Sequence, residues 1–321
     1  MDRKNEIGGY FELELNLGKN EWHPNALKLN SGRYCLQYIL QAKKYKKVYL
    51  PYYICDSVLQ PIKNENVSYE FYSINENFEP IFDGIVKDDE CFLYVNYFGI
   101  NEKNVEKIVL KHKNVIIDNT QAFFNFPFKN TDTFYSTRKF FGVPDGAYLY
   151  ISKDLSIHLH KEISLNRMDY LLKRIESSAN DGYNLFRNNE SYFDTCGLHE
   201  MSKLTETILG SIDYEKCREI RNHNFLYLHE KLSKYNDLDI DLDNLNGPMV
   251  YPFMNYTPNL RDKLIENKIY VATYWNEVKD RVNEHSFENK FVDYLIPLPI
   301  DQRYDFVDMS IIIEAIESLI V

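Results

Sequence analysis

An aspartate and a lysine in the middle of the chain have the types and spacing best suited to chemistry. Asp118 ends the apolar run 115–117, and Lys139 stands between an aromatic-rich turn and the break at 144–146. A lysine among aromatic residues and beside Arg138 can have a lowered pKa, because loss of water and a like charge both disfavour the ammonium form. A neutral amine is what Schiff-base formation with an aldehyde requires. Taken alone, the lysine could lie on the surface, and the aspartate could cap a turn, bind a metal or pair with a buried cation.

A third candidate is the stretch NSGR, residues 30–33, which precedes an amphipathic helical pattern. Ser31 can cap that helix, and Gly32 permits a close approach of the backbone. Free N–H groups at a helix start, aided by the helix dipole, form an anion site that suits phosphate. Most such helix starts bind nothing. Together with the aspartate and the lysine, however, the turn predicts one ligand, pyridoxal phosphate, which presents an aldehyde, a ring nitrogen and a phosphate.

Short apolar strands that alternate with helical patterns must position these residues. The patterns predict strands over 46–51, 67–74, 90–99, 114–119, 133–137 and 146–152, and helices over 56–65 and 101–113. Near-continuous apolar strands in this order predict an α/β fold, with a mostly parallel central sheet flanked by helices. Because ligands bind beyond the carboxyl ends of such strands, Asp118 is expected at a ligand-binding edge.

The second half of the chain has a different pattern. Helical patterns dominate from about 160 to 232, and an apolar segment at 249–256, a helix at 259–268, a strand at 269–275 and a closing helix at 305–321 follow. We interpret residues 1–212 as a large cofactor-binding domain whose N-terminal segment could pack on the small domain. Residues 213–321 are predicted to form that smaller α+β domain.

Composition and charge exclude several classes of protein. The 321 residues carry a net charge of −11, which argues against nonspecific nucleic-acid binding. The five cysteines are scattered without a CxxC pair, and the histidines lack metal-ligand spacing, so neither a disulfide framework nor a metal site is predicted. No segment reaches the roughly 18 apolar residues needed to span a bilayer. The sequence therefore predicts a soluble, cytoplasmic protein without membrane partners.

Several motifs together resemble one known family. The sequence is similar to the sugar aminotransferases of the DegT/StrS type, pyridoxal-phosphate enzymes with the aspartate-aminotransferase-like architecture (fold type I). The segment VIIDNTQAFF is close to that family's IEDxAQA, and LNSGRYCLQYIL resembles its phosphate turn. The segments VYLPYYICDSVLQPI and FLYVNYFGINEKNVEKIV resemble further strand–helix pieces, and YSTRKFFGVPDGAYL stands where the family has its lysine and a glycine-rich turn.

This resemblance implies a role for each matching residue. Lys139 would hold the cofactor aldehyde covalently and move protons. Asp118 would pair with the pyridine nitrogen, and Gln121 would lie by the ring hydroxyl. Four residues would surround the phosphate: Ser31, Gly32, Arg33 and Ser136.

The chain also departs from the family pattern. The position of the ring-stacking aromatic residue aligns with Cys55, which cannot stack, so Tyr53 or Tyr97 could take its place. Asn96 stands where the family has a histidine, and PDG replaces the glycine-rich turn at 144–146. The role of Arg138 stays open between a grip on substrate and a pair with an acid.

The resemblance implies an aminotransferase that acts on a nucleotide-linked keto-sugar, with glutamate as amino donor. Its products would serve surface polysaccharide or secondary-metabolite synthesis, and the protein would be a homodimer. One alternative is a non-catalytic relative of the same fold that serves as a binding or regulatory protein. Another is a pyridoxal-phosphate enzyme with a different outcome, such as a sugar dehydratase, although family members of that type replace the lysine by histidine.

Overall fold

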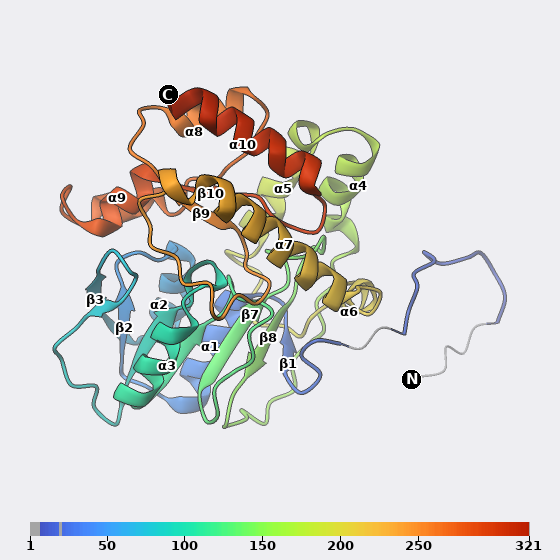
Figure 1. Cartoon of the computed structure of the whole chain (residues 1–321). Helices are drawn as coiled ribbons and strands as arrows, with labels where there is room; N and C mark the ends of the chain where they lie inside the picture. Colours follow the sequence, from blue (N-terminus) through green and yellow to red (C-terminus); the bar gives the residue numbers. More distant parts are fainter. Residues whose placement is uncertain (1–6, 19–20, 321) are drawn as a thin grey trace.

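A large sheet with helices packed against it forms the main body of the molecule (Figure 1). The computed structural model describes residues 7–18 and 21–320. Eight strands form one sheet in the order β1-β8-β7-β6-β5-β2-β3-β4, and two more form a small antiparallel sheet in the C-terminal part. The predicted α/β fold with a mostly parallel sheet is confirmed. Residues 1–6 and 321, which belong to the predicted domains, lie outside the described residues.

Six of the eight strands of the large sheet overlap predicted strands, whereas β1 and β4 were not predicted. The eight strands are β1 (Leu27–Leu29), β2 (Lys47–Pro51), β3 (Ser68–Ile74), β4 (Pro80–Ile81), β5 (Glu90–Val95), β6 (Val115–Asp118), β7 (Asp132–Ser136) and β8 (Ala147–Tyr150). Strands β3, β2, β5, β6 and β7 are parallel neighbours, whereas β4, β8 and β1 pair antiparallel. Every residue of β5, β6 and β7 is buried, which agrees with the apolar runs at 91–95 and 115–117.

Helices connect and cover these strands. They are α1 (Gly32–Lys43), α2 (Leu59–Asn64), α3 (Glu102–Lys111), α4 (Asp169–Glu176), α5 (Ala179–Tyr192), α6 (Lys203–Leu209), α7 (Tyr214–Leu232), α8 (Leu260–Glu266), α9 (Phe287–Tyr294) and α10 (Phe306–Ile320). Helix α1 packs against β7 and β8, and α3 packs against β6. The predicted domain boundary at residue 212 falls in the short connection between α6 and α7. None of the helices in the described part of the chain is long and apolar enough to cross a membrane.

The topology brings several turns to one edge of the sheet. Because β1 is antiparallel to β8, and β8 is antiparallel to β7, β1 runs in the same direction as the parallel strands. The turn after β1 therefore lies at the same edge as the carboxyl ends of β6 and β7. Asp118, the last residue of β6, pairs in register with Val95 of β5 and Phe134 of β7. The edge thus collects the turn at 30–32, Asp118 and Ser136.

One predicted strand is wrong. Residues 269–275 alternate in character as a strand does, but they form no strand in the structure. The small sheet instead pairs β9 (Tyr251–Met254) with β10 (Leu295–Leu298). The alternation of apolar and polar residues at 269–275 instead reflects the burial of Ile269 and Val271 in the core.

The N-terminal segment extends away from the rest of the chain (Figure 1). Residues 7–18 are mostly exposed, and Tyr10 and Phe11 are almost fully so. The packing of this segment on the small domain, which the sequence analysis allowed, stays a prediction.

Arg221 of α7 connects the turn that contains Lys139 with the C-terminal part of the chain. Its buried guanidinium donates to the carbonyls of Pro248 and Met249, both at 3.1 Å, and to Phe140 O at 3.4 Å. It also donates to Gln302 Oε1 at 3.0 Å. Burial lowers the pKa of Arg221 to about 10, and the negative charge of Asp301 opposes this lowering.

We expect Arg221→Met to lower the free energy of unfolding by about 2–4 kcal/mol, because the buried acceptors lose their donors. Urea unfolding of both proteins measures the difference. Arg218→Met is the matched control on the same helix. Its half-exposed ion pair with Glu215 predicts a loss below about 1 kcal/mol. Equal losses in the two variants would contradict the structural role of Arg221.

Candidate active site

Thr120 connects the predicted aspartate and lysine. Lys139 Nζ donates to Thr120 Oγ1 at 2.9 Å, and the backbone N–H of Thr120 donates to Asp118 Oδ1 at 2.8 Å. Lys139 comes from the turn between β7 and β8, which starts tightly because Thr137 O accepts from the N–H groups of Phe140 and Phe141. The structure therefore brings the aspartate and the lysine together, as the sequence predicted.

The two charged groups influence each other. Burial raises the pKa of Asp118, and the nearby Lys139 opposes that rise. Loss of water lowers the pKa of Lys139, Asp118 opposes this lowering, and Arg138 adds to it. Lys139 nevertheless remains accessible to solvent. An accessible amine with a lowered pKa is suited to react with a carbonyl group.

The turn at the start of α1 has the features of an anion site. Ser31 occupies the N-cap position with extended backbone, yet its hydroxyl makes no capping hydrogen bond. Ser31 is buried, and its Oγ has no hydrogen-bond partner among the described residues. A Cβ atom on Gly32 would lie 3.1 Å from Thr120 Cγ2, so the turn lies directly beside the Asp118–Lys139 pair. A buried free hydroxyl at a helix N-terminus fits a phosphate ligand.

Gln121 is buried with one half of its amide unused. Its Oε1 accepts from the N–H of Phe98 at 2.8 Å, while its Nε2 has no partner in the part of the chain that the structure describes. Ser136 ends β7 at the same edge and is also buried. The positions of both residues agree with the predicted site, and their contacts with a ligand stay predictions.

The guanidinium of Arg33 binds protein groups and not the predicted phosphate site. Its Nη1 donates to Asp194 Oδ1 at 2.6 Å, to Gln60 Oε1 at 2.6 Å and to Phe193 O at 3.0 Å. The side chain thus fastens α1 to the segment after α5. Its backbone N–H remains the group through which Arg33 would bind a phosphate.

The candidates for ring stacking lie in different surroundings. Tyr53 and Tyr97 are fully buried, and Tyr53 packs edge-on against Trp275 with ring centroids 4.6 Å apart. A ring without an accessible face cannot stack on a ligand unless it moves. Cys55 is partly exposed and close enough to Lys139 to affect its charge. Among Cys55, Tyr53 and Tyr97, only Cys55 is therefore accessible near Lys139.

Arg138 pairs with an acid. Its guanidinium forms an ion pair with Glu190 of α5 and lies over the ring of Phe193, 4.3 Å from the ring centroid. Burial lowers the pKa of Arg138 to about 10. The structure thus shows the pairing with an acid, which is one of the two roles that the sequence left open.

The break at 144–146 joins the lysine turn to two neighbours. The carboxylate of Asp145 is fully buried and accepts from Ser202 N at 2.8 Å, from Ser202 Oγ at 2.7 Å and from Thr205 Oγ1. The N–H of Gly146 donates to Asn30 O at 2.7 Å. The lysine turn is thus fastened both to α6 and to the predicted phosphate turn.

Thr120 was missed by sequence reasoning. A threonine between an aspartate and a glutamine carries no recognisable signal, because its role depends on Lys139 and Gly32 reaching it from elsewhere in the fold. Its place inside the DNTQ stretch was the only available indication.

Comparisons with known proteins identify structures of similar fold. No known protein-family profile and no curated protein sequence match the chain. The sugar aminotransferase CalS13 from Micromonospora echinospora shares 13% identity with a TM-score of 0.62, over 92% of this chain and 87% of that one. Spr1654 from Streptococcus pneumoniae in its PLP form, assigned as a sugar aminotransferase, shares 13% identity with a TM-score of 0.64, over 93% and 88%.

A third similar structure has a different activity. The E. coli GDP-4-keto-6-deoxy-D-mannose-3-dehydratase with bound hydrated PLP shares 14% identity with a TM-score of 0.60, over 91% of this chain and 87% of that one. Identities of this size show the fold alone. The chain therefore has the fold of sugar aminotransferases and of pyridoxal-phosphate enzymes that modify sugars.

The lysine turn depends on glycine at position 146. Gly146 has φ +115°, and a Cβ atom there would lie 2.5 Å from Thr137 Oγ1. We expect Gly146→Ala to lower the free energy of unfolding by about 1–3 kcal/mol, measured by urea unfolding. In the same turn, Gly142→Ala meets only Leu171 Cδ2 at 3.6 Å and should stay within about 0.5 kcal/mol of the parent chain. A tolerated Gly146→Ala would show that the turn is less constrained than this geometry implies.

Proposed function

We propose that the protein is a pyridoxal-phosphate-dependent aminotransferase that acts on a nucleotide-linked keto-sugar. This proposal rests on the arrangement of Asp118, Thr120 and Lys139 beside the Ser31 hydroxyl, which has no partner among the described residues. A buried carboxylate, an accessible lysine and an anion site at one sheet edge are the three partners that pyridoxal phosphate requires. The fold shared with sugar aminotransferases supports the same conclusion.

The residues present fit this cofactor. Ser31 and the first N–H groups of α1 would hold the phosphate, because the hydroxyl is buried and has no hydrogen-bond partner within residues 7–18 and 21–320. Asp118 would keep a proton on the ring nitrogen, since a buried carboxylate is stabilised by an adjacent positive charge. Gln121 offers an Nε2 donor that no described residue accepts from. When bound, pyridoxal phosphate supplies an electron sink for bonds broken at the substrate carbon.

Lys139 would bind the cofactor and move protons. Its lowered pKa increases the fraction of neutral amine at a given pH, and the neutral amine is the form that attacks a carbonyl or accepts a proton. Thr120 Oγ1 accepts from Nζ and holds the amine beside Asp118. A lysine held this way can return to the same position after each proton transfer.

Glutamate is the proposed amino donor and the nucleotide-linked sugar the acceptor. A sugar dehydratase reaction is the second candidate, because a dehydratase shares the fold at a similar TM-score. Lys139 favours the aminotransferase, since a primary amine can both hold the cofactor and transfer the proton that amino-group exchange needs.

Lys139→Ala tests the cofactor and its attachment. We expect the parent chain to acquire a yellow absorption band with pyridoxal phosphate that survives desalting, and glutamate to bleach it. Lys139→Ala should lack this band after desalting, because no other amine is proposed to hold the cofactor. Lys113→Ala removes an exposed lysine paired with Asp88 and should behave like the parent chain.

Asp118→Asn separates cofactor binding from catalysis. This variant should retain the band, while bleaching by glutamate slows by about 100-fold, because the ring nitrogen loses its charged partner. A folded parent chain that forms no band would overturn the enzyme proposal. A band that no amino acid bleaches would instead favour the non-catalytic relative.

We also propose that two copies associate through α4 and α5. Helix α4 has no buried residue, and its Leu172 and Ile175 are 53% and 80% exposed. The neighbouring Tyr183 and Phe186 of α5 are 55% and 39% exposed. Exposed apolar side chains gathered on two packed helices are typical of a protein interface. We propose that a second copy of this chain covers these exposed side chains.

We expect the parent chain to sediment as a dimer and the double variant Leu172→Glu with Ile175→Glu to sediment as a monomer, because two buried charges would oppose association. Sedimentation velocity at micromolar concentrations measures both. Leu110→Glu changes an 81% exposed leucine of α3 and should leave the dimer intact. A monomeric parent chain, or a dimeric double variant, would contradict this interface.

A further inference from the structure

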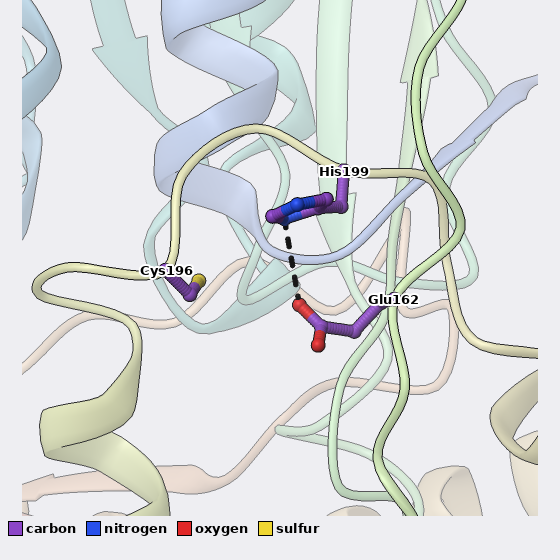
Figure 2. Close-up of side chains that lie close together, drawn as sticks. All are labelled: Glu162, Cys196 and His199. Atoms are coloured by element: carbon purple, nitrogen blue, oxygen red, sulfur yellow. Dashed lines mark ion pairs between the residues drawn. The ribbon is translucent and has the colours of Figure 1, made fainter.

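Three side chains with metal-binding atoms converge outside the candidate active site. Figure 2 shows Glu162, Cys196 and His199, with the imidazole of His199 facing the carboxylate. Their ligand atoms all lie within 4.8 Å of one another, and His199 Nδ1 is 3.8 Å from Glu162 Oε2. Tetrahedral zinc with ligands at 2.0–2.3 Å places those atoms about 3.3–3.8 Å apart. Shifts of about 1 Å would therefore close the site around an ion.

The backbone holds the two contributing segments together. Glu162 N donates to Glu200 O, and Glu200 N donates to His160 O, both at 2.9 Å. Gly197, with φ +86°, turns the chain between Cys196 and His199. The Cys-x2-His spacing can therefore present both side chains to the Glu162 carboxylate from a scaffold fixed by hydrogen bonds.

The surrounding residues leave the inner ligand atoms available. Glu162 Oε1 accepts from Tyr192 Oη at 2.9 Å and contacts Arg167 at 3.1 Å. Its Oε2 faces His199, and Asn30 Nδ2 donates to that oxygen at 3.1 Å and to Cys196 Sγ at 3.5 Å. Donors of this kind are the usual outer partners of metal-bound carboxylates and thiolates.

One alternative explanation of this cluster is an ion pair between Glu162 and Arg167. That pair gives no role to His199. His199 Nδ1 is buried, yet it has no hydrogen-bond partner among the described residues. A nitrogen enclosed next to a carboxylate and a thiol, and without a hydrogen-bond partner, is placed as a ligand atom would be.

We propose that Glu162 Oε2, Cys196 Sγ and His199 Nδ1 bind one zinc ion or a similar divalent transition metal, with water as the fourth ligand. Sulfur, imidazole and carboxylate ligands together suit zinc and cobalt better than magnesium or calcium. Binding displaces the thiol proton of Cys196 to solvent and forms the sulfur–metal bond. Asn30 N also donates to His199 O at 3.0 Å, so the ion would fasten the turn that leads to α1. The sequence predicted no metal site, because Glu162 is distant in sequence from the other two ligands.

Cobalt titration of the full chain tests the site without any measure of activity. We expect the chain, first treated with a chelator, to bind one equivalent of Co²⁺ and to develop the charge-transfer band of a thiolate–cobalt bond. Excess Zn²⁺ should abolish that band. Cys196→Ser should lose it, and His199→Gln should weaken cobalt binding at least about tenfold. Circular dichroism establishes that each variant is folded.

Cys55→Ser and His160→Gln are the matched controls, since both residues lie outside the cluster. Both should bind cobalt as the parent chain does. A parent chain that shows no thiolate band at one equivalent, or a folded Cys196→Ser variant that keeps the band, would overturn the proposal. Loss of the band in Cys55→Ser would also overturn it, because the metal would then lie beside Lys139.

Discussion

A buried carboxylate at the end of a central strand is the constraint on which the candidate site depends. Asp118 lies at the carboxyl edge of the sheet, where burial raises its pKa and penalises its charge. Such a charge persists only beside hydrogen-bond donors or a cation. The chain supplies both, through the backbone of Thr120 and the ammonium group of Lys139. The turn between β7 and β8 must therefore return to the end of β6, and its shape follows from that requirement.

The sheet topology lets distant segments meet this requirement together. The strand β1 runs in the direction of β7, so the turn that precedes α1 lies at the same edge. The N–H of Gly146 donates to Asn30 O and ties that turn to the lysine turn. Asp145 then fastens the same turn to Ser202 and Thr205 at the start of α6. A rigid, hydrogen-bonded connection thus stands where the resembled family has a glycine-rich turn, and it leaves Lys139 beside Asp118.

The sequence predicted the residues whose chemistry depends on their own type and their place at a strand end. Asp118 belongs to this group through its place at the end of β6, and Lys139 through its place in the turn after β7. The buried strands β5 and β6 follow from continuous apolar runs. Contacts between distant segments left no such pattern, so neither the role of Thr120 nor the pairing of Arg33 with Asp194 could be predicted. The strand predicted at 269–275 failed for a related reason, since alternation records burial and not the presence of a pairing strand.

Stability alone gives no reason for the polar groups gathered at this edge. Replacement of a buried charged pair by apolar side chains often costs no stability, because a buried carboxylate such as Asp118 loses its hydration. The Ser31 hydroxyl and the Nε2 of Gln121, which lack partners in the described part of the chain, add a further cost in free energy. A bound phosphate and a cationic ring would satisfy these groups together. The same groups would serve a non-catalytic binder equally well, except for Lys139, whose lowered pKa and solvent access add a capacity for reaction that binding does not need.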